Sequence, residues 1–129
     1  MNQIEKLGMN NETFFFDTYA FFEIIRGSPK YKDYLNSNII TAIFNIAELN
    51  YNLKKEKNKE VADNITKKYY QFIVEVTLND IQIAMDLKTN KKELSIPDAI
   101  GYIIAKKHNV KFLTGDDDFR NMENVEFVK

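Results

Sequence analysis

The stretch from Leu94 to Phe119, LSIPDAIGYIIAKKHNVKFLTGDDDF, constrains the possible fold most strongly. Ser95, Pro97 and Asp98 predict a helix start, because a serine hydroxyl and a carboxylate satisfy free backbone N–H groups and proline costs little in the first turn. Apolar residues at helical spacing follow, and then cations that suit the end of the helix dipole: Ala99, Ile100, Ile103, Ile104, Lys106, Lys107 and His108. Residues 110–114, VKFLT, predict a short buried strand that leads into three consecutive aspartates.

A helix between strands is the half-unit of a parallel sheet, and the rest of the chain repeats this alternation. Strands are predicted at residues 14–16, 38–41, 72–76, 110–114 and 125–128, and further helices at residues 19–26, 30–36, 42–56, 61–70 and 80–87. Three consecutive phenylalanines in the first strand are typical of a central strand that is covered on both faces. The sequence therefore predicts an α/β fold, a three-layer α/β/α domain with a central parallel sheet of four to five strands and right-handed crossovers.

One domain is expected over residues 13–129, preceded by a polar, Asn-rich arm at residues 1–12, and residues 54–60 predict a solvated turn. The chain contains no cysteine. This excludes disulfides, thiolate metal sites and cysteine nucleophiles, and it fits a reducing compartment. No apolar run reaches membrane-spanning length and the N-terminus does not resemble a secretion signal, so we expect a cytoplasmic protein without a membrane partner.

Four carboxylates occupy positions where structure alone would not place them: Asp17, Glu48, Asp98 and Asp116. Asp17 ends a buried strand, and Glu48 lies within an apolar helix beside Phe44 and Tyr51. Asp98 begins a buried helix, and Asp116 follows another buried strand. An unpaired buried carboxylate is costly, and a divalent cation is the usual means of holding several together. Oxygen ligands without cysteine or paired histidines indicate Mg²⁺ or Mn²⁺ rather than zinc.

Each acid also has an ordinary structural explanation. Asp17 and Asp98 could simply cap helices, Glu48 could face solvent, and residues 116–118 could form a solvated turn. We interpret His108 as a surface residue near a helix end. The case for a site depends on all four acids meeting at the carboxyl edge of the sheet, where such folds place their ligands.

Four segments, taken in order, resemble the PIN-domain family and most closely its VapC-type toxins: FFFDT at 14–18, IAELNYNL at 46–53, LSIPDAIGYIIAKKHNV at 94–110 and FLTGDDDF at 112–119. The resemblance implies that Asp17, Glu48, Asp98 and Asp116 are the catalytic, metal-binding acids, with accessory positions at Thr114 and Asp118. It also implies Mg²⁺- or Mn²⁺-dependent endoribonuclease activity, a homodimer, and neutralisation by an antitoxin peptide in a type II toxin–antitoxin pair.

Other interpretations remain. A phosphotransfer enzyme of the haloacid dehalogenase type needs a second acid two residues after the first, but that position is Tyr19. A non-catalytic PIN-like scaffold that binds RNA or protein is the alternative from a different class. Because the net charge is −1, RNA binding would require local basic patches, with candidate lysines that ordinary solvation also explains: Lys54, Lys55, Lys91 and Lys92.

The first helices are unusually aromatic, with Tyr19, Phe21, Phe22, Tyr31 and Tyr34. Such a surplus predicts an interface, either between two copies of the chain or with an antitoxin helix. Ordinary core packing is the competing explanation.

Overall fold

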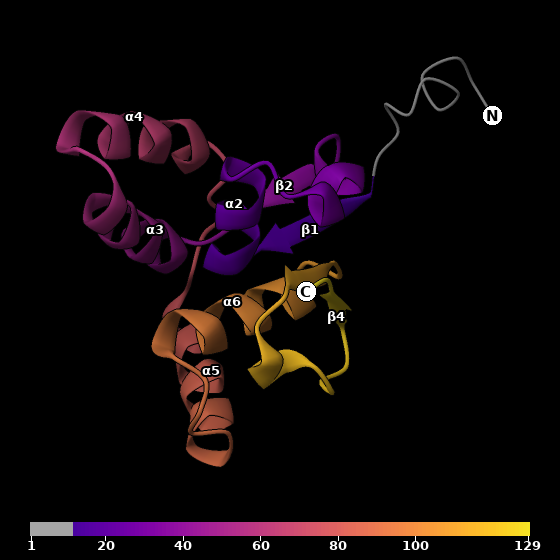
Figure 1. Cartoon of the computed structure of the whole chain (residues 1–129). Coiled ribbons are helices and arrows are strands. Elements are labelled where there is room, and N and C mark those ends of the chain that lie inside the picture. Colours follow the sequence, from indigo (N-terminus) through magenta and orange to yellow (C-terminus); the bar gives the residue numbers. More distant parts are fainter. Residues whose placement is uncertain (1–11) are drawn as a thin grey trace.

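A parallel four-stranded sheet in the order β2-β1-β3-β4 organises the computed structural model (Figure 1). Its strands are β1 (Thr13–Phe16), β2 (Asn38–Ile40), β3 (Lys111–Thr114) and β4 (Val125–Phe127). The structure describes residues 12–129, so the predicted arm at residues 1–12 lies outside the described residues apart from Glu12. The prediction of an α/β fold with a central parallel sheet is confirmed.

Helices cover both faces of the sheet, which gives the expected three layers. Between the strands lie α2 (Thr18–Ile25), α3 (Ile43–Glu56), α4 (Lys59–Tyr70), α5 (Leu78–Asn90) and α6 (Ile96–Lys107), and the short 3₁₀ helices are η1 (Pro29–Tyr34) and η2 (Asp117–Phe119). Figure 1 shows α3 and α4 paired beyond α2, with α5 and α6 on the other side of the strands.

The three phenylalanines of β1 explain this layering, because successive strand residues point to opposite faces. Phe14 and Phe16 belong to a buried cluster with residues of α2, α3 and α4, whereas Phe15 packs with residues of α5 and α6. Phe15 also stacks on Phe112 of the neighbouring strand β3, with ring centroids 5.5 Å apart. The sheet is therefore apolar on both faces.

The predicted strand at residues 72–76 is wrong. Only Ile73 pairs, in an isolated parallel bridge with Thr41. Thr41 donates its N–H to Phe72 O and accepts from Val74 N, at 3.0 and 2.9 Å. In parallel register with this bridge, residues 75 and 76 fall opposite the start of α3 rather than opposite β2, so the pairing ends after one residue.

Two other predicted boundaries shift. The turn predicted at residues 54–60 is shorter, because α3 continues to Glu56 and Asn58 already caps α4 by accepting a hydrogen bond from Val61 N. Helix α5 extends to both sides of the predicted range and begins with a capping box between Thr77 and Asp80.

The aromatic residues of the first helices belong to the core rather than to a free surface. Phe21, Phe22 and Tyr31 are buried, and Tyr19 and Tyr34 pack against the same cluster. Tyr31 donates its hydroxyl to Val128 O and Tyr34 donates to Glu126, which ties them to the C-terminal segment. The surplus from which an interface was predicted is thus used in core packing.

One close helix–strand approach sets the position of α6. A Cβ atom on Gly101 would lie 2.7 Å from the Phe15 ring, so glycine lets α6 rest directly on β1. This approach holds the N-terminus of α6 near the carboxyl end of the sheet. Within residues 12–129, no helix combines the length and apolar character required to cross a membrane.

Candidate active site

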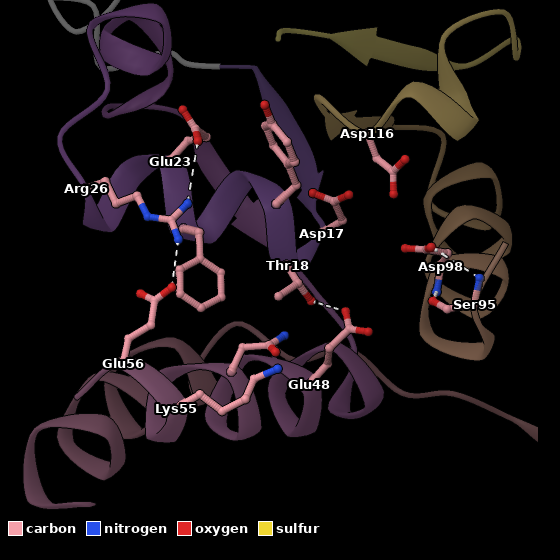
Figure 2. A pocket seen from close by; sticks show the side chains of 13 residues that line it. Asp17, Thr18, Glu23, Arg26, Glu48, Lys55, Glu56, Ser95, Asp98 and Asp116 are labelled. Carbon is pink, nitrogen blue, oxygen red and sulfur yellow. Dashed lines mark hydrogen bonds and ion pairs between the residues drawn. The ribbon is translucent and has the colours of Figure 1, made fainter. Parts of the chain in front are cut away.

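A cleft of about 480 Å³ opens where β1 and β3 end, and side chains from α2, α3, α6 and the loop after β3 line it (Figure 2). All four acids singled out in the sequence contribute to its walls: Asp17, Glu48, Asp98 and Asp116. They come from four separate segments, so only the fold brings them together. Figure 2 shows the carboxylates of Asp17, Asp98 and Asp116 directed toward one shared space, with Glu48 approaching from α3.

Asp17 is the most deeply buried of the four acids, at 2% relative exposure. It caps α2, since its Oδ1 accepts a hydrogen bond from Ala20 N at 2.9 Å. Burial raises the pKa of the Asp17 carboxyl well above its ordinary value, and the nearby charges of Asp98 and Asp116 raise it further. Hydrogen bonds from Thr114 and Ala20 act in the opposite direction. Asp17 therefore caps α2 and lines the cleft at the same time.

Glu48 is half-buried on α3 and points into the cleft rather than into solvent. Its Oε1 accepts a short hydrogen bond, 2.5 Å, from the Thr18 hydroxyl of α2. The expected apolar surroundings are only partly present, because Tyr51 is 65% exposed. A polar contact from the neighbouring helix fixes Glu48 instead.

Asp98 completes a capping box at the start of α6, as the sequence predicts. Asp98 N donates to the Ser95 hydroxyl at 3.2 Å, and Ser95 N donates to Asp98 Oδ2 at 3.3 Å. Burial raises the pKa of Asp98 to about 6 despite the lowering effect of these hydrogen bonds, and the charges of Glu48 and Asp116 contribute to the rise.

Asp116 follows β3 and caps η2, because its Oδ1 accepts from Asp118 N at 2.9 Å. Thr114 is fully buried and connects two of the acids: its hydroxyl accepts from Asp116 N at 3.0 Å and hydrogen-bonds the Asp17 carboxylate. Asp118 is exposed and does not line the cleft, although partial desolvation and the Asp116 charge raise its pKa. The two expected accessory residues thus differ, since both hydrogen-bond Asp116 but Thr114 is buried and also hydrogen-bonds Asp17.

The cleft is strongly acidic. Among the described residues, six carboxylates and two cations line it, which corresponds to a formal charge of −4 when all are ionised. One cation, Arg26, is held by Glu56 at 3.0 Å and Glu23 at 3.9 Å, and it lies over the Phe22 ring. The other, Lys55, lies along α3 with its nitrogen directed toward Glu48 (Figure 2).

Several lining residues are absent from the sequence prediction: Thr18, Tyr19, Phe22, Glu23, Arg26, Asn52, Glu56 and Ser95. The signal for Thr18 was available, because it follows Asp17 directly at a helix start. Arg26 and Glu56 are thirty residues apart, and only the packing of α2 on α3 joins them.

The donor set suits a hard divalent cation, because it consists of carboxylate oxygens in a cleft that lacks enough cations to neutralise them. Local hydrogen bonds occupy one oxygen each of Glu48, Asp98 and Asp116. Within residues 12–129, however, no three acidic or histidine side chains are gathered closely enough to hold an ion as they stand. The residues fit a metal by chemistry and by placement around one cleft, without forming a closed cage.

Among curated proteins, none matches the chain significantly. Of the solved structures, a chain of a toxin–antitoxin complex from Klebsiella pneumoniae superposes with a TM-score of 0.69 at 20% identity, covering 88% of this chain and 95% of that one. A chain from the crystal structure of VapBC2 from Rickettsia felis, bound to a DNA fragment from its promoter, superposes with a TM-score of 0.68 at 18% identity. The match covers 91% of this chain and 99% of that one. At these identities the likeness concerns the fold.

The model of the PIN domain matches residues 14–125, which include all of β1 but its first residue, the segments carrying Asp17, Glu48, Asp98 and Asp116, and the start of β4. PIN domains are generally nucleases that depend on divalent metals. With this match and the fold described above, the chain belongs to the PIN-domain family.

Proposed function

We propose that this protein is a Mg²⁺- or Mn²⁺-dependent endoribonuclease that cleaves phosphodiester bonds of RNA in the cytoplasm. The observation that carries the proposal is the convergence of four carboxylates from four segments on one cleft (Figure 2). A site with this much negative charge would repel an RNA backbone by itself. A bound divalent cation would reduce that repulsion and would supply Lewis-acid chemistry at the scissile phosphate.

The acids and their hydrogen-bond partners would have distinct roles. Asp17, Asp98 and Asp116 would hold the metal, and Glu48 would complete its shell or orient the attacking water. Thr18 would keep Glu48 in place through the hydroxyl that it donates. Thr114 would fix the relative positions of Asp17 and Asp116, since it bonds to both. Asp118 would support Asp116 through its backbone N–H.

RNA cleavage assays with defined oligonucleotides in Mg²⁺, in Mn²⁺ and in EDTA test the activity. The wild-type protein should cleave in either metal and not in EDTA. Asp98→Asn should bring cleavage to background in both metals, because a ligand charge is lost at nearly constant shape. A wild-type protein that binds RNA without cleaving it under any of these conditions would support the non-catalytic scaffold instead, which the open arrangement of the acids would also suit.

We also propose that the protein is the toxin of a type II toxin–antitoxin pair, acts as a homodimer and is neutralised by an antitoxin peptide. Support comes from the fold, which matches chains of complexes described as toxin–antitoxin and VapBC assemblies. A neighbouring gene for a small DNA-binding protein whose co-expression suppresses cleavage would support the pairing. Light scattering at micromolar concentration tests the homodimer, and a monomer mass would contradict it.

A further inference from the structure

Helix α3 has two polar faces with different partners. Asn50 and Lys54 face α4, where both bind Asp63 at 3.0 Å. Asn52 and Lys55 face the cleft beside Glu48. Adjacent residues of one helix therefore separate into a structural face and a face turned toward the candidate active site.

Lys55 is the lining cation that remains available to a ligand. Arg26 is committed to two carboxylates, as described above. Lys55 forms no ion pair with any residue of the described part of the chain, and its nitrogen lies 4.8 Å from the centroid of the Tyr51 ring. It is exposed, so a phosphate could approach it without displacing a protein partner.

The Tyr51 ring lies beneath this cation, which covers one of the two faces of the ring. Its side chain is 65% exposed, and it belongs to neither of the two buried clusters. An exposed aromatic ring beside a lysine is the combination that binds single-stranded nucleic acid, because the ring stacks on a base and the cation pairs with a phosphate. Neither interaction depends on base identity.

We propose that Tyr51, Asn52 and Lys55 form a binding site for single-stranded RNA on α3, adjoining the acids. A base would stack on Tyr51, a phosphate would pair with Lys55, and the Asn52 amide would donate to the backbone between them. This proposal rests on the function proposed above and names the form of its substrate. Lys55 follows Glu48 by seven residues, roughly 10 Å along the helix, so a strand bound at Lys55 would reach the acids within a few nucleotides.

The stacking contact sets the preference for an unpaired strand. Within a duplex the faces of the bases are already covered by neighbouring base pairs, so Tyr51 would have nothing to stack on. The phosphates of a duplex of the same sequence could still pair with the ammonium group of Lys55.

Binding of a fluorescent single-stranded RNA to the full chain in Ca²⁺ at low salt tests the site without requiring cleavage, because the ion offsets the negative charge of the cleft. Tyr51→Ala should weaken binding by about 5- to 100-fold. Lys55→Gln should weaken it several-fold and reduce the log–log salt slope by about 0.7. Matched controls are Tyr70→Ala, which removes another exposed tyrosine, on α4, and Lys54→Gln, which changes the neighbouring lysine on the other face; both should bind like wild type.

The same measurement is repeated with a double-stranded RNA of the same sequence. Tyr51→Ala should bind this duplex as tightly as wild type does. The proposal is overturned if wild type does not bind the single strand, if Tyr51→Ala and Lys55→Gln bind as tightly as wild type, or if the two controls lose as much affinity. Absence of metal-dependent cleavage, combined with binding that depends on Tyr51 and Lys55, would reject the ribonuclease function while leaving this RNA site intact.

Discussion

The carboxyl groups of Asp17 and Asp98 have raised pKa values in the folded protein, so ionising them costs stability. Burial is the largest cause for both carboxyl groups, and the charge of Asp116 raises the pKa of each. In the absence of a metal the fold therefore carries the cost of several like charges in one cleft. That cost should be visible in the stability of single-residue variants.

Asp98→Asn should leave the metal-free protein as stable as wild type or more stable, because one of the crowded charges is removed at nearly constant shape. Adding Mg²⁺ or Mn²⁺ should raise the melting temperature of wild type through preferential binding to the folded state, and raise that of the variant distinctly less. Thermal melts in EDTA and in millimolar metal measure both effects. A variant that melts far below wild type in EDTA would show that Asp98 serves mainly as a helix cap.

Thr18→Val should reduce RNA cleavage without unfolding the protein. The hydroxyl that holds Glu48 would be lost, while a side chain of similar shape would keep the packing of α2 against α3. Loss of such a supporting contact reduces metal affinity or activity by about 10- to 100-fold. The metal concentration needed for half-maximal cleavage is the measurement, and an unchanged profile would remove Thr18 from the site.

At the scale of single elements, the sequence predicts the segments with a strong local signal. The Ser95–Asp98 capping box, the apolar run of α6 and the three phenylalanines of β1 each lie in the structure where the pattern places them. The strand at residues 72–76 fails because its pairing depends on the length of β2, a property of another segment. Likewise, no local pattern shows that Thr18 meets Glu48 or that Arg26 meets Glu56, since each pair is separated by thirty residues.

The link between α5 and α6 gives a prediction about stability. Asp80 is 4% exposed, closes the capping box of α5 and pairs with Lys107 of α6 at 2.9 Å. Asp80→Ala removes the carboxylate that accepts from Thr77 N and pairs with Lys107, while Thr77 still caps the helix, so it should lower the free energy of unfolding by about 1–2 kcal/mol. Urea unfolding measures this, with Asp86→Ala, an exposed acid on the same helix, as the control. Equal small losses in both variants would contradict the structural role of Asp80.

At the scale of the whole molecule, the acidic cleft predicts how stability depends on pH. The pKa of Asp98 rises from 3.8 to about 6 in the folded state, and that of Asp17 also rises. A raised carboxyl pKa favours the folded state at low pH, and this contribution is lost as pH rises through the folded-state value. For Asp98 the loss corresponds to about 2–3 kcal/mol.

Urea unfolding in EDTA should therefore show stability falling between about pH 4 and pH 7. The carboxyls with lowered pKa values, such as Asp63 and Asp80, change stability below this range and do not mask the effect. Asp98→Asn should flatten the profile, and saturating Mg²⁺ should reverse it, because the ion favours ionised ligands. Stability that rises steadily from pH 4 to pH 7 in EDTA would be incompatible with a crowded acidic cleft.

The most direct test of the central claim compares two neighbouring aspartates. Asp116 lines the cleft, whereas Asp117 is exposed and pairs with Arg120 and Lys129. The measurement is the rate of single-stranded RNA cleavage in Mn²⁺ by Asp116→Asn and Asp117→Asn, each normalised to wild type. A metal-dependent ribonuclease centred on the four acids predicts background cleavage for Asp116→Asn and a rate within about twofold of wild type for Asp117→Asn, since exposed ion pairs contribute little. Equal rates for the two variants, at any level, would contradict it.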